Sequence, residues 1–116
     1  MDNHYNHFKK IDAHSHIGKF GSPFNIDFDL QRLMEQMETY NIEKTILCPA
    51  GCHLNEELKD AYQAAPDKII PLCWVNANEG QEAYDMLEHY LRDENFAGVK
   101  MQPLFDAFTA DSPMVD

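Results

Sequence analysis

The sequence has few basic residues. Nine Lys and Arg stand against 20 Asp and Glu in 116 residues, so the formal net charge is −11. An acidic field of this size repels polyanions, and the few cations are scattered along the chain rather than clustered. We therefore expect neither a nucleic-acid partner nor an anionic membrane partner.

Long apolar runs are also missing. No stretch approaches the roughly 18 apolar residues of a membrane-spanning helix, and the polar segment 1–8 has no apolar core typical of a signal peptide. The three cysteines, Cys48, Cys52 and Cys73, form no C-x-x-C pair. Their odd number favours reduced thiols. Together these absences predict a cytoplasmic protein. The length of 116 residues is enough for one small domain with a hydrophobic core.

The sequence does contain short apolar runs that alternate with amphipathic helical patterns. The apolar runs predict strands over 9–18, 44–49, 69–75 and 97–102. Helical spacing predicts helices over 27–40, around Leu58 and over 81–93. Either Asp27 or Asp29 can cap the first helix, and 19–26 reads as a loop. The third helix is expected to bury Ala83, Met86, Leu87, Tyr90 and Leu91.

This β-α-β-α-β-α-β order predicts a parallel sheet. Strand starts about 25–35 residues apart match the spacing of a (β/α)8 TIM-type barrel, which needs about 250 residues. We therefore expect one domain over 1–116, the N-terminal half of such a barrel with about four strands and three helices. Residues 1–8 would be a tail, and 104–116 a loop leading to a missing fourth helix. A compact doubly wound domain is the competing architecture.

The first predicted strand ends in two histidines. Alternate residues of a strand share a face, so its polar set would line the barrel mouth and its apolar set would pack under the helices. The set at the barrel mouth is Asp12, His14 and His16, and the set under the helices is Ile11, Ala13, Ser15 and Ile17. Two imidazoles at the mouth can bind one divalent metal, with zinc expected, and the metal lowers the pKa of bound water to about 7. The alternative is two solvent-facing loop histidines.

Three segments resemble a known family. Ile-Asp-Ala-His-Ser-His-Ile-Gly at 11–18 resembles the first-strand signature of the amidohydrolase superfamily, and 37–47 looks like its first helix running into its second strand. Phe-Ala-Gly-Val-Lys-Met-Gln-Pro at 96–103 is similar to the Gly-Val/Ile-Lys-Leu-His-Pro stretch of the amidohydrolase-related branch. That branch includes aminocarboxymuconate-semialdehyde decarboxylase, resorcylate decarboxylases and lactone hydrolases. The resemblance covers nearly all of 9–116.

The resemblance implies a metal-dependent hydrolase or decarboxylase that acts on a small carboxylate-bearing compound. Its members carry further metal or catalytic residues on later strands: a His on strand five, commonly a His on strand six, and an Asp on strand eight. Those strands have no counterpart here. We therefore expect no catalytic acid or base in this chain, and a fragment that is inactive alone.

Lys100 is a further candidate, on the face that Gly98 and Gln102 share. It could anchor a substrate carboxylate or pair with Asp12. The resemblance adds a third role, because fourth-strand lysines bridge two metals as carbamates in binuclear members of the superfamily. Gln102 stands where the family usually has His, which argues against an imidazole role there.

Other candidates lie in the loops at the same mouth. Lys19 could pair with an anionic substrate, and Phe20 and Phe24 could wall the pocket. Trp74 reads as a core residue or a platform for an aromatic acid. His53 reads as a solvated loop residue that could approach substrate.

Two other functions remain open. A TatD-type or PHP-type phosphoesterase also opens with His-x-His, although the TatD-type pattern has Glu where this chain has Lys100. A non-catalytic barrel fragment is the other alternative, with two copies forming a homo-oligomer that covers the open sheet edges.

Overall fold

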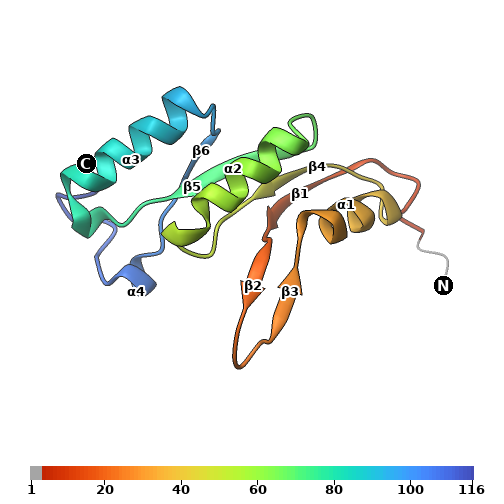
Figure 1. Cartoon of the computed structure of the whole chain (residues 1–116), viewed down its shortest axis with the longest axis horizontal. Coiled ribbons are helices and arrows are strands. Elements are labelled where there is room, and N and C mark those ends of the chain that lie inside the picture. Colours follow the sequence, from red (N-terminus) through yellow and green to blue (C-terminus); the bar gives the residue numbers. More distant parts are fainter. Residues whose placement is uncertain (1–3) are drawn as a thin grey trace.

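A four-stranded parallel sheet is the centre of the fold in the computed structural model, which describes residues 4–116 (Figure 1). Its strands, all paired in parallel, are β1 (Lys10–Ser15), β4 (Ile42–Leu47), β5 (Ile69–Trp74) and β6 (Gly98–Lys100). Their order in the sheet, β1-β4-β5-β6, is their order in the chain. A doubly wound sheet reverses its order at a switch point, so this sheet is an arc of a barrel.

Three helices connect the strands: α1 (Leu30–Thr39), α2 (Asn55–Ala64) and α3 (Gln81–Glu88). Their buried side chains form one core with alternate residues of the central strands, such as Leu47, Ile69 and Cys73. A single core indicates helices on one face of the sheet. The other face remains available for the site. Within residues 4–116, every helix is too short or too polar to cross a membrane.

Asp29 caps α1, where its carboxylate accepts a hydrogen bond from the backbone N–H of Arg32 at 2.9 Å. Asp29→Ala is expected to lower the free energy of unfolding by about 0.5–2 kcal/mol, because one N–H of the first turn loses its acceptor. Urea titration measures the loss. Asp27→Ala is the matched control: Asp27 only pairs with Lys19 on the surface, and we expect a change within about 0.5 kcal/mol. Equal losses in both variants would contradict this assignment of the cap.

The first strand is shorter than predicted, and the loop expected over 19–26 contains strand structure. β1 ends at Ser15, and β2 (Gly18–Phe20) pairs antiparallel with β3 (Ile26–Phe28). Gly18 has a φ of +133°, a backbone angle that favours glycine, and the chain leaves the sheet there. The β2–β3 hairpin projects away from the sheet (Figure 1).

The apolar face of β1 is only partly covered. Ile17 is buried as predicted, but Ile11 is 61% exposed and Ala13 is also exposed, so their predicted packing under the helices is wrong. The reason is topological: β1 is an edge strand of the sheet, and α1 packs against its neighbour β4.

Two later segments also differ from expectation. After α3 the chain continues as a π-helical turn over His89–Asp93; Leu91 is exposed there, whereas its predicted burial requires regular α-helical spacing. The segment expected as a loop over 104–116 contains most of a short helix, α4 (Pro103–Asp106), which Pro103 starts. Of the predicted tail, residues 1–3 lie outside the described residues.

Candidate metal centre

The two histidines at the end of β1 face each other. Their Nε2 atoms are 2.9 Å apart. The Nδ1 of His16 is 2.6 Å from the carbonyl oxygen of Cys48. Because a carbonyl can only accept, Nδ1 carries the proton, and a neutral His16 keeps its Nε2 lone pair free. That lone pair can accept an N–H from His14 or bind a metal.

Backbone and side-chain contacts between β1 and β4 hold this pair in place. The hydroxyl groups of Ser15 and Thr45 are hydrogen-bonded, and the Cys48 N–H donates to the Ser15 carbonyl at 2.9 Å. Asp12 accepts the backbone N–H of His14 at 3.0 Å. The paired strands therefore fix the backbone on both sides of the imidazoles, and the Cys48 carbonyl orients the ring of His16.

The imidazole pair opens into a pocket of about 600 Å³ at the carboxyl ends of the strands. Lys100, from the opposite edge strand β6, lines the same pocket. Within residues 4–116 its ammonium group forms no hydrogen bond or ion pair. The lining is completed by Pro49, Ala50, Trp74, Gln102, Leu104 and Phe105.

Trp74 forms one wall of this pocket and is held from two sides. Its backbone N–H donates to the side-chain oxygen of Asn55 at 2.7 Å, and its carbonyl accepts from the same amide at 2.9 Å. Its indole N–H donates to Asp106 of α4 at 2.8 Å. Phe105 meets the indole edge-on, with ring centroids 5.8 Å apart. Trp74 is buried, as expected of a core residue, and it also lines the pocket; its role as a platform for an aromatic acid stays a prediction.

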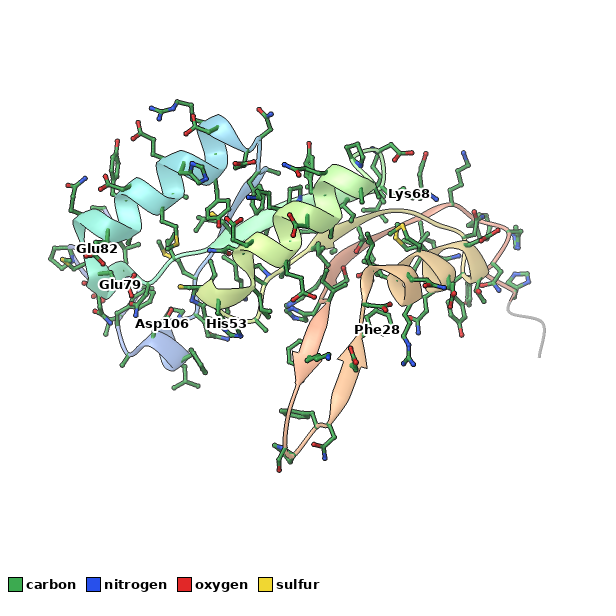
Figure 2. All side chains as sticks on the ribbon, in the orientation of Figure 1. Phe28, His53, Lys68, Glu79, Glu82 and Asp106 are labelled. Atoms are coloured by element: carbon green, nitrogen blue, oxygen red, sulfur yellow. The ribbon has the colours of Figure 1, made fainter. Side chains whose placement is uncertain are left out.

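Two candidate residues lie outside the pocket lining. The side chain of Lys19 is 84% exposed, and it pairs with Asp27 across the hairpin at 3.9 Å. His53 is exposed near the start of α2 (Figure 2). The expected pairing of Lys100 with Asp12 does not occur among the described residues. Phe20 and Phe24 line a neighbouring pocket that shares only His16 with the larger one.

Sequence reasoning missed Asn55 and Asp106, which support Trp74. Asn55 is almost fully buried at the first turn of α2, and Asp106 lies on α4 (Figure 2). The only local signal was Pro103, which is typical of the first turn of a helix. The hydrogen bonds that Asn55 and Asp106 form with Trp74 have no sequence signature, because each joins residues that are far apart in the chain.

The residues near the two imidazoles do not complete the coordination of a metal ion. Metal–nitrogen bonds of about 2.0–2.1 Å allow two nitrogens on one ion to be at most about 4 Å apart, and the His14 and His16 Nε2 atoms meet this limit. No cluster of three His, Cys, Asp or Glu side chains suited to a metal exists in the described part of the chain.

Cys48, whose carbonyl contacts His16, does not add a thiolate ligand. Burial raises the pKa of the Cys48 thiol, although Lys100 opposes the shift, so this thiol stays protonated near neutral pH.

Comparison with known proteins finds a relative in fold. No protein-family model matches the sequence, and no match is found among curated proteins. A solved structure of 5-carboxyvanillate decarboxylase from Novosphingobium aromaticivorans, with bound manganese and 3-methoxy-4-hydroxy-5-nitrobenzoic acid, matches with a TM-score of 0.70 and 16% identity. The match covers 84% of this chain, which spans 42% of the length of that one. The fold is therefore half of a TIM-type barrel, as the sequence predicted.

Proposed function

We propose that this half-barrel contributes the metal-binding strand and a substrate-anchoring lysine to a metal-dependent hydrolase or decarboxylase of small carboxylates, related to the amidohydrolases. The main support is one arrangement: the His14 and His16 Nε2 atoms 2.9 Å apart, in the same pocket as Lys100. The fold relative is a decarboxylase with bound manganese and a substituted benzoic acid, which favours this reading over a phosphoesterase.

In this proposal each residue has a defined task. His14 and His16 hold a divalent ion, zinc or manganese, through their Nε2 atoms, while the Cys48 carbonyl keeps the proton of His16 on Nδ1. Lys100 binds the substrate carboxylate through its ammonium group. Trp74 and Phe105 offer apolar ring surface to an aromatic substrate. When bound, a divalent ion supplies Lewis acidity and a more acidic water.

The described residues hold only part of the chemistry that turnover needs. Catalytic zinc sites usually have three protein ligands, and the described chain provides two imidazoles. Among residues 4–116, no carboxylate or imidazole beyond that pair lines the pocket to move a proton. We therefore propose that residues 1–116 alone bind metal and carboxylate without turnover, and that turnover requires a further metal ligand and a proton-transfer group.

Binding of benzoate tests the role of Lys100. Trp74, the only tryptophan, lines the pocket, so its fluorescence is expected to report benzoate binding in the presence of Mn²⁺. Lys100→Met is expected to weaken benzoate binding by at least about tenfold, since a hydrogen bond to a charged group contributes about 1.5–3 kcal/mol.

Lys19→Met is the matched control for this titration, because it removes an exposed ammonium group outside the pocket lining. We expect benzoate to bind this variant as it binds the original chain. Benzoate binding that depends on neither Lys100 nor Mn²⁺ would contradict the proposed function.

The sheet edges favour a second candidate, a half-barrel that self-associates. β1 and β6 are the edge strands, and each exposes an apolar residue, Ile11 and Val99. Unpaired edges of this kind template further strands. The native mass distinguishes the two candidates, since a stable dimer without bound Mn²⁺ would support self-association without metal chemistry.

A further inference from the structure

A second pocket adjoins the imidazole pair on the side of the β2–β3 hairpin. Its volume is about 360 Å³, and it is lined by His16, Phe20, Phe24, Ile26 and Phe28. Every lining side chain except the imidazole is apolar. His16 lines both pockets, so the two pockets adjoin at this ring.

The pairing of the hairpin explains why one of its faces is apolar. Phe20 lies opposite Ile26, and Lys19 lies opposite Asp27. Directly opposite residues of an antiparallel pair share a face, and neighbouring pairs alternate between faces. One face therefore carries Phe20 and Ile26, and the other carries the ion pair of Lys19 with Asp27 at 3.9 Å. Phe28 follows Ile26 by two residues, so it extends the apolar face towards the sheet. Figure 2 shows Phe28 at the base of the hairpin.

Two of the side chains that line the hairpin pocket are exposed to solvent: Phe24 by 70% and Ile26 by 49%. A contiguous apolar surface beside a binding pocket is typical of a ligand site. The neighbouring pocket complements it, because Lys100 is the only lysine or arginine in its lining among the described residues. The pocket that contains Lys100 and the apolar hairpin pocket thus lie on either side of His16.

We propose that the hairpin pocket is a subsite for the apolar substituent of a monocarboxylate whose carboxylate is held at Lys100. The ligand class is a carboxylate with an extended hydrocarbon or aryl group, rather than a small polar acid. The placement of the carboxylate rests on the proposed function. The role of the hairpin rests on the apolar face and on the ring of His16 that the two pockets share.

Butanoate and octanoate are the probes for this subsite, with the fluorescence of Trp74 as the readout. Each additional buried CH2 strengthens binding about fourfold, so the original chain is expected to bind octanoate at least about tenfold more tightly than butanoate. In the double variant Phe24→Ser/Ile26→Ser this advantage is expected to fall below about threefold, with butanoate affinity unchanged. Both residues are largely exposed, so the variant should keep the fold, which far-UV circular dichroism checks.

Tyr84→Ser is the matched control, because Tyr84 is an exposed aromatic residue on α3 outside both pockets. It is expected to keep the full octanoate advantage. The subsite is overturned if the double variant keeps that advantage, or if neither acid changes the Trp74 signal. It is also overturned if the double variant only converts a dimer to a monomer, since the apolar face would then be an interface between copies.

Failure of the proposed function is read separately, from a Mn²⁺ titration of the same proteins. An octanoate advantage that depends on the hairpin in a chain that binds no Mn²⁺ supports the subsite and rejects the metal chemistry. Mn²⁺ binding without any octanoate advantage rejects the subsite and leaves the metal site standing.

Discussion

Replacing either His14 or His16 with alanine is expected to weaken Mn²⁺ binding by about a hundredfold. With only two imidazoles in the described site, each replacement removes half of the protein ligands. Loss of a supporting group outside the coordination sphere already costs about 10–100-fold in metal affinity, and loss of a ligand should cost at least as much. Isothermal titration calorimetry with Mn²⁺, and with Zn²⁺ as the alternative ion, measures the effect.

His53→Ala is the control for this experiment. It also removes one imidazole, but His53 is exposed and lies outside the pocket lining. Its metal affinity should match that of the original chain. If the three variants bind metal equally, the assignment of His14 and His16 as ligands is wrong. The histidine pair would then be two hydrogen-bonded rings, which their 2.9 Å separation also allows.

Leu47→Ala is expected to lower the free energy of unfolding by about 2–5 kcal/mol, the range for a leucine removed from a packed core. Leu47 lies on β4 and is completely buried in the core that strands and helices share. The surrounding residues are held by the sheet and by α1 and α2, so they cannot close the cavity fully. Chemical denaturation with urea, monitored by circular dichroism, measures the loss.

Leu104→Ala is the matched control, with the same chemical change at a side chain that is 92% exposed. Its effect on the free energy of unfolding is expected to stay within about 0.5 kcal/mol. A loss at Leu104 as large as that at Leu47 would mean that the exposed surface of α4 is covered in solution, for example by another copy of the chain.

Much of the sheet could be predicted because its signals are local. Apolar runs and helical spacing locate the strands and helices to within a few residues, and Asp29 at the start of α1 is one of the two caps that the sequence offers. Strand alternation also predicted that His14 and His16 share a face, and the two imidazoles do face each other although β1 ends at Ser15. The prediction failed for Ile11, because sequence periodicity does not reveal which strand lies at the edge of a sheet.

The rest of the site depends on contacts between distant segments. The bond from Trp74 to Asp106 joins residues 32 positions apart, and the bonds from Asn55 to Trp74 join residues 19 positions apart. The hairpin could not be predicted for a different reason. Its strands have three residues each, and the Gly, Ser and Pro between them are typical of loops. Short strands carry too few alternations to be recognised.

Because of the strand order, the relative position of the pocket residues depends on the whole sheet. His14 lies on β1, His16 directly follows it, and Lys100 lies on β6. These are the two outermost strands, so the span between them accumulates the twist of three successive strand pairs. A repacking under β4 or β5 that leaves every pocket residue in place would still rotate one edge against the other. If the two edges hold metal and carboxylate as proposed, the distance between these two groups depends on the packing of the interior, and substitutions outside the pocket can change it.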